Sequence, residues 1–118
     1  MKKVKEIMST NCIFCTPLDN VFEAAVKMKE SNADAVLIVE NDQLAGIITD
    51  RDLVTKGIAE KRPGSTKITD VMNDDVVTIT PDASAEDAAE MLAAHHIHHL
   101  PVVEDGKVVG IITERCFT

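Results

Sequence analysis

Three polar side chains, Thr49, Arg51 and Asp52, come directly after the apolar run 44–48. A hydroxyl beside the free backbone amides at the start of a predicted helix suits an anion, and Arg51 adds a donor for a charge-assisted hydrogen bond. The same Thr-x-x-Asp spacing is typical of a capping box, in which Thr49 caps the helix and Asp52 occupies its third position. The two roles are compatible, and the residues alone leave both open.

This motif occurs twice. GIITDRD begins at Gly46 and GIITERC begins at Gly110, an offset of 64 residues that holds without a gap over about 48 residues. A duplication of this kind predicts two similar halves packed about a pseudo-twofold axis, with a cleft between them. The second copy has Cys116 where the first has Asp52. A thiol is a poor hydrogen-bond acceptor, so we expect the two copies to differ in binding.

Four histidines, at positions 95, 96, 98 and 99, form a dense cluster. A metal site needs converging imidazoles. His98 and His99 would point to opposite faces if they begin a strand, and His95 and His96 at a helix C-terminus suit the helix dipole. We therefore favour a structural role for the cluster over a metal site.

The cysteines show a Cys-x-x-Cys spacing at Cys12 and Cys15, with Cys116 as the third thiol. A structural metal site usually needs four ligands, so buried structural thiols are favoured. If residues 12–15 form a strand, like the corresponding 76–79, the two thiols face apart and no disulfide is expected between them.

Composition excludes several classes of protein. A net charge of −8 over 118 residues argues against sequence-independent nucleic-acid binding. The sequence has no apolar run of membrane-spanning length, no signal peptide and an odd number of cysteines, which predicts a cytoplasmic protein. No nucleophile–base pair, phosphate-binding loop or dinucleotide motif is present, so we expect no enzyme.

Each half is predicted to contain a strand, a helix, two strands and the start of another helix. Asn20 and Ser84 are N-cap candidates, each followed three residues later by an acidic residue, and polar turns separate the paired strands. The first repeat is expected at 1–59, the linker at 60–70, and the second repeat, with its final helix cropped, at 71–118. The predicted strands are 35–39, 44–48, 76–79, 100–103 and 108–112, and the predicted helices are 21–31, 49–58 and 85–95.

These residues together resemble a tandem pair of cystathionine-β-synthase-type (CBS) domains. The resemblance rests on the two Gly-Ile-Ile-Thr segments, on Thr16-Pro17 and Thr80-Pro81 before the helices, and on His99–Val103. It implies an α+β (α/β-like) fold of two β-α-β-β-α repeats that associate through their sheets into one compact module. It also implies a homodimer of two pairs and a regulatory role, with adenosine-containing ligands in the clefts between repeats.

The resemblance also implies roles for single residues. In nucleotide-binding members, the residue at the position of Thr49 contacts phosphate, and the one at Asp52 accepts hydrogen bonds from both ribose hydroxyls. A carboxylate has two acceptor oxygens for such a diol. Basic residues before the Leu-Pro-Val strand reach phosphates, which assigns that role to His98 and His99. The implied ligand-binding set is Ile48, Thr49, Arg51, Asp52, His98, His99 and Thr113, with Asn11, Cys12, Ile13 and Val36 near the adenine.

The leading hypothesis is a ligand-sensing module that binds AMP, ADP, ATP, S-adenosylmethionine or a related adenosyl compound, needs no cofactor, and acts on an unknown effector protein. One alternative is a dimerisation module that binds no ligand. A less favoured alternative is a metal protein that uses the Cys or His side chains.

Overall fold

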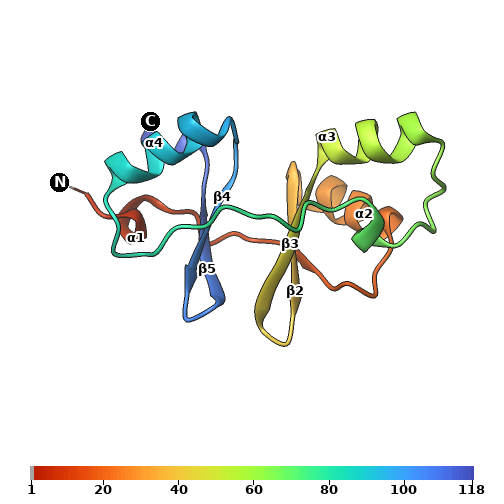
Figure 1. Ribbon diagram of the computed structural model, residues 1–118, viewed down its shortest axis with the longest axis horizontal. Coiled ribbons are helices and arrows are strands. Elements are labelled where there is room, and N and C mark those ends of the chain that lie inside the picture. The colour runs from red at the N-terminus through yellow and green to blue at the C-terminus, as the bar shows by residue number, and fades with distance from the viewer. Residues whose placement is uncertain (1) are drawn as a thin grey trace. The chain divides into compact units, whose positions relative to one another are not determined.

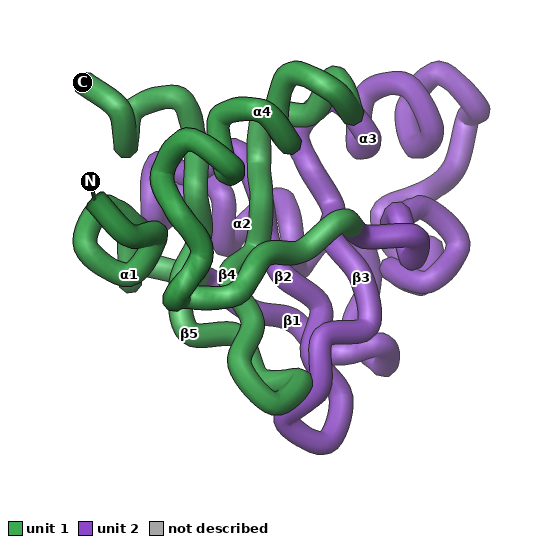
Figure 2. The backbone as a smooth tube through the Cα atoms, turned by 60° about the vertical axis from the view of Figure 1, so that its left-hand side comes forward, with its two compact units in different colours: residues 1–12, 77–118 green, residues 13–76 purple. Residues whose placement is uncertain are grey.

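The computed structural model of the protein describes residues 2–118. These residues form two compact units (Figures 1 and 2). Unit 1 contains residues 2–12 and 77–118, and unit 2 contains residues 13–76. The units therefore do not coincide with the two sequence repeats. Each repeat contributes its first segment to the unit that is formed mainly by the other repeat.

Unit 2 is built on a three-stranded sheet in the order β1-β2-β3. β1 (Phe14–Cys15) pairs in parallel with β2 (Ala35–Glu40), which pairs antiparallel with β3 (Gln43–Thr49). α2 (Val21–Ser31) and the 3-10 turn η3 (Ile68–Asp70) complete the hydrophobic core. The buried residues of this core are Cys15, Val21, Ala24, Met28, Val36, Ile38, Ile48, Ile68 and Val71.

Unit 1 is built on a two-stranded antiparallel sheet of β4 (Leu100–Glu104) and β5 (Lys107–Ile112). The helices are α1 (Val4–Ile7), α4 (Ala85–His95) and the 3-10 turn η4 (Glu114–Phe117). The fold is thus α+β in both units, and no helix of residues 2–118 is long and apolar enough to cross a membrane. The core contains Val4, Ile79, Ala88, Leu92, Leu100, Val102 and Ile112.

The two main helices begin and end at the predicted residues, because their caps are encoded locally. The side chain of Asn20 accepts a hydrogen bond from the Glu23 amide at 3.0 Å, and Ser84 accepts one from the Asp87 amide at 3.0 Å. The C-cap residues of α2 and α4, Asn32 and His96, adopt left-handed backbone conformations. The polar turns between the paired strands also lie where they were predicted.

The predicted strand at 76–79 is wrong. In unit 1 only Ile79 pairs with β4, through an isolated parallel bridge to Val102. In unit 2 the corresponding pairing includes a hydrogen bond from the Leu37 amide to the Ile13 carbonyl at 2.9 Å. The residue that corresponds to Leu37 is Pro101, which has no N–H to donate. The second repeat therefore cannot make the hydrogen bond that extends β1 in the first repeat.

The predicted helix 49–58 begins as expected but is not a regular α-helix. Its first turn, α3 (Asp50–Asp52), is followed by a π-helical segment, η1 (Leu53–Gly57), and a 3-10 turn, η2 (Ile58–Glu60). The Thr55 hydroxyl donates to the Arg51 carbonyl at 2.8 Å. A side chain that bonds to the carbonyl four residues earlier competes with the helical hydrogen bonds, and this position lies within the irregular segment.

Each unit is closed by backbone pairing at a glycine. In unit 2, Ile47 and Asn73 exchange two hydrogen bonds of 2.9 and 2.8 Å, and in unit 1, Ile111 and Ser9 exchange two of 2.9 Å. A Cβ atom added to Gly46 would lie 2.7 Å from the Met72 sulfur and 2.9 Å from the Asn73 carbonyl oxygen. Gly110 faces Met8 and Ser9 in the same way, at 2.5 and 3.0 Å. The glycine in each Gly-Ile-Ile-Thr segment thus provides space for the incoming segment.

We predict that Gly46→Ala lowers the free energy of unfolding by about 1–3 kcal/mol, because the added methyl group must displace a backbone that is already hydrogen-bonded. Gly57→Ala is the matched control, since a Cβ atom there meets nothing within 4 Å. Urea denaturation followed by circular dichroism measures both variants. Equal unfolding free energies for the two would contradict this account of Gly46.

Candidate functional site

Thr49 and Asp52 form a closed hydrogen-bonded pair at the end of β3. The Thr49 hydroxyl oxygen accepts from the Asp52 amide at 3.2 Å and donates to Asp52 Oδ2 at 3.1 Å. Asp52 Oδ2 also accepts from the Thr49 amide at 3.0 Å. The capping box expected from the Thr-x-x-Asp spacing is therefore present. It holds the carboxylate in a fixed position, with its side chain only 16% exposed.

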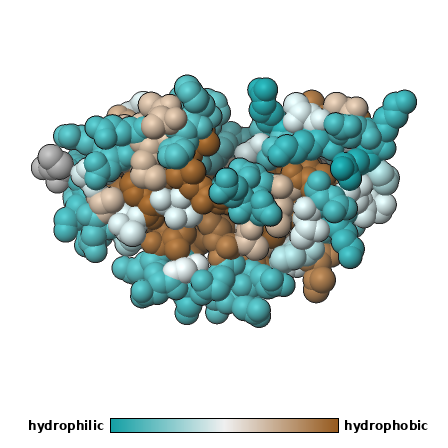
Figure 3. Space-filling model, viewed as in Figure 1, coloured by the Kyte–Doolittle hydropathy of each residue, from teal (hydrophilic) through white to brown (hydrophobic). Residues whose placement is uncertain are grey.

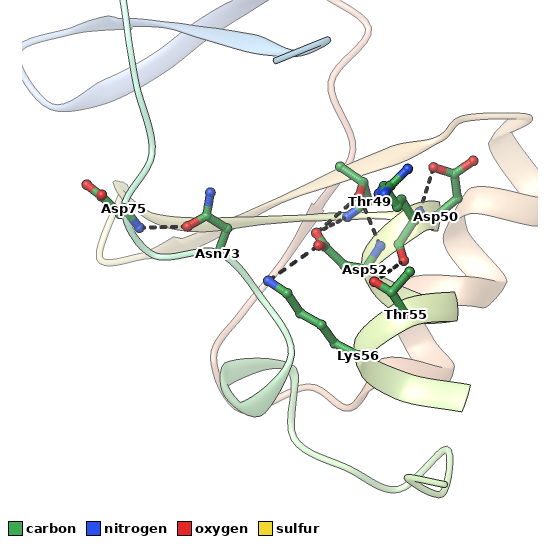
Figure 4. A network of polar contacts seen from close by, with 8 residues as sticks. Thr49, Asp50, Asp52, Thr55, Lys56, Asn73 and Asp75 are labelled. Atoms are coloured by element: carbon green, nitrogen blue, oxygen red, sulfur yellow. Dashed lines mark hydrogen bonds and ion pairs between the residues drawn. The ribbon is translucent and has the colours of Figure 1, made fainter. Parts of the chain in front are cut away.

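The second carboxylate oxygen of Asp52 has a different partner. Lys56 Nζ lies 3.5 Å from Asp52 Oδ1, and the lysine side chain is 51% exposed (Figure 4). The Asp50 side chain bonds to the backbone at the start of α3, where its Oδ1 accepts a hydrogen bond from the Arg51 backbone amide at 2.8 Å. The two oxygens of Asp52 therefore differ, because one is bound within the cap and the other faces a half-exposed amine.

Lys56 was not among the residues singled out from the sequence. It stands four residues after Asp52, and side chains at that spacing on a helix are neighbours. That spacing is the sequence signal that points to Lys56.

The second motif forms a weaker version of the same turn. Cys116 Sγ accepts from the Thr113 amide at 3.4 Å, lies 4.0 Å from the Thr113 hydroxyl and 3.8 Å from the Ile111 carbonyl oxygen. The sulfur thus takes the place of Asp52 Oδ2. No counterpart of Oδ1 exists, because a thiol has only one polar atom. The two copies of the motif are therefore chemically unequal.

The histidines end a helix and precede a strand. His95 is the last residue of α4 and His96 is its C-cap, whereas His98 and His99 lie before β4 rather than in it. His98 Nδ1 is 3.4 Å from Glu114 Oε1, and both side chains are more than three-quarters exposed, at 78% and 77%. Within residues 2–118, no three His, Cys, Asp or Glu side chains gather closely enough to hold a metal ion.

An open, mainly apolar groove runs between α4 and η4 of unit 1. His98 and Glu114 lie at its rim with His96, and Phe117 contributes to its wall. The apolar lining residues are Ala89, Leu92, Ala93, Ile97 and Phe117.

The residues expected near the adenine, and Ile48 of the implied ligand-binding set, lie in different surroundings. Val36 and Ile48 face each other in the β2–β3 register and have no exposed surface. Ile13 is partly buried against the same core, and its carbonyl is bound to the Leu37 amide. Asn11 is exposed, and its backbone N–H donates a hydrogen bond to the Ser9 hydroxyl oxygen at 3.2 Å. A ligand role for these residues stays a prediction, although Val36 and Ile48 are fully buried in the free protein.

The three cysteines are free thiols. Cys15 is buried in the core of unit 2 and is part of β1, whereas Cys12 lies outside the strand and belongs to unit 1. The expected strand across Cys12 and Cys15 is thus limited to Phe14–Cys15. Burial raises the pKa of both thiols, which keeps them protonated and poorly reactive at neutral pH.

Comparison with known proteins decides the family. Two stretches of the chain, residues 4–58 and 68–117, match the CBS domain. The chain belongs to the CBS-domain family. It is therefore a CBS pair, with one domain for each sequence repeat, and CBS pairs are regulatory ligand-binding modules.

Similar proteins include a relative from Bacillus subtilis and solved structures of CBS domains. The uncharacterized protein YlbB of Bacillus subtilis is 46% identical over 115 residues, which cover 96% of this chain and 78% of YlbB. A crystal structure of a CBS domain has a TM-score of 0.90 and 30% identity, with 98% of this chain and 93% of that chain covered. Another CBS pair, solved in complex with 5′-methylthioadenosine and S-adenosyl-L-methionine, has a TM-score of 0.89 and 29% identity, with coverages of 99% and 93%.

We predict that Thr49→Val lowers the free energy of unfolding by about 1 kcal/mol, because it removes the hydroxyl that both accepts and donates in the capping box. Thr113→Val should cost less, because the Thr113 hydroxyl meets a sulfur atom at 4.0 Å where the Thr49 hydroxyl meets a carboxylate oxygen at 3.1 Å. Urea denaturation of both variants gives the comparison. A larger loss at Thr113 than at Thr49 would show that the two turns do not differ as described.

Proposed function

We propose that this CBS pair is a regulatory module that binds an adenine nucleotide or another adenosyl compound at Thr49 and Asp52 of unit 2. The observation that carries the proposal is the state of the Asp52 carboxylate. It is largely buried, its Oδ2 is fixed by the cap, and its Oδ1 is paired with an exposed and replaceable amine. A fixed carboxylate with a replaceable partner suits the vicinal diol of a ribose.

A solved relative supports the class of ligand. The similar CBS pair in complex with 5′-methylthioadenosine and S-adenosyl-L-methionine binds two compounds that share an adenosyl group. By this analogy AMP, ADP, ATP and S-adenosylmethionine are the compounds to test here. Arg51 would contact phosphate or another anionic group, and Ile13 would lie near the adenine. A phosphate contact by Thr49 would require its hydroxyl proton to leave Asp52 Oδ2. Ligand contacts by His98 and His99 remain separate predictions.

Regulation would follow from a difference in affinity. An adenosyl compound that binds one conformation of the pair more tightly shifts the population toward that conformation. An effector protein that recognises the favoured conformation would then respond to the concentration of the compound. The signal can be no larger than the difference in the ligand's binding free energy between the two conformations.

The Asp52 site is tested by exchanging the acidic position between the two motifs. We predict that Asp52→Ala weakens AMP binding by about tenfold or more, because a hydrogen bond to a charged group contributes about 1.5–3 kcal/mol. Cys116→Asp should strengthen binding at the second motif, because it restores the missing acceptor oxygens. Isothermal titration calorimetry of the unaltered protein and both variants measures these effects. Equal affinity at two sites in the unaltered protein, or no response to Asp52→Ala, would refute the proposal.

Self-association is a second candidate function, favoured by exposed apolar side chains. Apolar surface is visible on the drawn face of each unit (Figure 3). Ile58 is 75% exposed and Val54 is 57% exposed, both on the helical segment that follows Asp52. Phe117, which is 41% exposed, borders the apolar groove of unit 1. Apolar patches of this kind often mark contacts between proteins.

We predict a homodimer at micromolar concentration, and we expect Ile58→Glu to shift it toward the monomer by placing a charge in an apolar contact. Glu30→Gln on the exposed face of α2 is the control. Sedimentation velocity over a range of concentrations measures the mass of each variant. A monomer throughout the micromolar range would count decisively against this second function.

A further inference from the structure

The Lys56 side chain lies against the carboxylate that the proposed function assigns to the ligand. Its Nζ is 3.5 Å from Asp52 Oδ1, and the lysine is half-exposed whereas the aspartate is 16% exposed (Figure 4). Lys56 therefore stands on the solvent side of the pair. A ligand group that binds Oδ1 therefore has this ammonium group as a neighbour.

The hydrogen bonds of Asp52 determine which oxygen is open to a ligand. Oδ2 already accepts two hydrogen bonds from Thr49, one from its amide at 3.0 Å and one from its hydroxyl at 3.1 Å. A carboxylate has two oxygens with about four acceptor positions in total, so Oδ2 is filled. Oδ1 keeps about two acceptor positions for ribose hydroxyls, and Lys56 Nζ lies 3.5 Å from it.

A ribose diol that uses both acceptor positions of Oδ1 must then displace Lys56, unless it opens the capping box. An ion pair with an exposed lysine contributes little, because water screens it and the long side chain loses freedom in forming it. Loss of an N-cap costs more, because it leaves backbone amides at the helix start without partners. Lys56 is therefore the partner that leaves, while the cap stays intact and holds the carboxylate in place.

We propose that Lys56 is an exchangeable counterion that sets the preference of this site for phosphorylated ligands. This inference rests on the proposed function. In the free protein the ammonium pairs with Asp52 Oδ1. In the complex the ligand hydroxyls take Oδ1, and the ammonium moves to the phosphate of the ligand. A nucleoside displaces Lys56 without offering it a new partner, whereas a nucleotide supplies one.

The chemistry of lysine suits this exchange. Its ammonium is a compact charge on a flexible stem of four carbons, so it can move between neighbouring acceptors. A phosphate monoester carries more negative charge than a carboxylate, so it attracts the ammonium group more strongly than Asp52 does. The exchange therefore makes nucleoside binding weaker and nucleotide binding stronger than the carboxylate alone would give.

The test is Lys56→Met, which keeps most of the stem and removes the charge. Calorimetry with adenosine and with AMP, on the full chain, measures both affinities. We expect adenosine to bind about two- to fivefold more tightly, since its competitor is gone. AMP should bind about fivefold or more weakly, since its phosphate loses a charged donor. Lys29→Met, an exposed lysine on α2 of the same unit, is the matched control for the loss of one positive charge.

The outcomes separate this inference from the proposed function. Opposite changes for the two ligands in Lys56→Met, with no such change in Lys29→Met, support the exchange. If Lys56→Met leaves both affinities unchanged, or changes those for adenosine and AMP in the same direction, the exchange is overturned. The proposed function still stands in that case, provided that the unaltered protein binds the ligands. If the unaltered protein binds neither adenosine nor AMP, the proposed function fails, and the role of Lys56 fails with it. Thermal unfolding of each variant confirms that it is folded before titration.

Discussion

Backbone pairing at two glycines is the constraint on which both units depend. At Gly46 the strand β3 lies so close to Met72 and Asn73 that no side chain fits between them, and Gly110 holds the same place beside Met8 and Ser9. The incoming segment comes each time from the start of the other repeat. Each unit is therefore completed by a segment that is distant in the sequence, and neither repeat has a complete core without the other.

This pairing fixes the strand that ends at the candidate site. Ile47 is bound to Asn73 on one side and faces Leu37 on the other, so the position of Thr49 two residues later is determined by the sheet. Thr49 then caps the following helix and orients Asp52 through three hydrogen bonds. In the proposed complex, capping and ligand binding would use different oxygens of one carboxylate. The cap positions the acceptor, and Oδ1 would meet the ligand.

The sequence predicted best what is decided locally. The helices Val21–Ser31 and Ala85–His95 were located to the residue, because apolar spacing and N-cap side chains are both present in the sequence. The prediction of a strand at 76–79 was wrong. Its pairing would need a backbone N–H at position 101, which is a proline and is distant in the sequence. The exchange of first segments between units could not be predicted either, because it depends on contacts over many residues. At the site, the capping box followed from the spacing of Thr49 and Asp52, whereas the pairing of Lys56 with Asp52 emerged only from the geometry.

The central claim is that an adenosyl ligand binds where the carboxylate is, and not where the thiol replaces it. Amide chemical shifts from heteronuclear NMR, recorded while AMP is added to the uniformly labelled protein, test this claim most directly. The account predicts that the amides of Thr49, Asp52 and Lys56 shift first, and that those of Thr113 and Cys116 respond only at a concentration about tenfold higher or more. Shifts that begin at Thr113 and Cys116, or that affect both motifs equally, would contradict it.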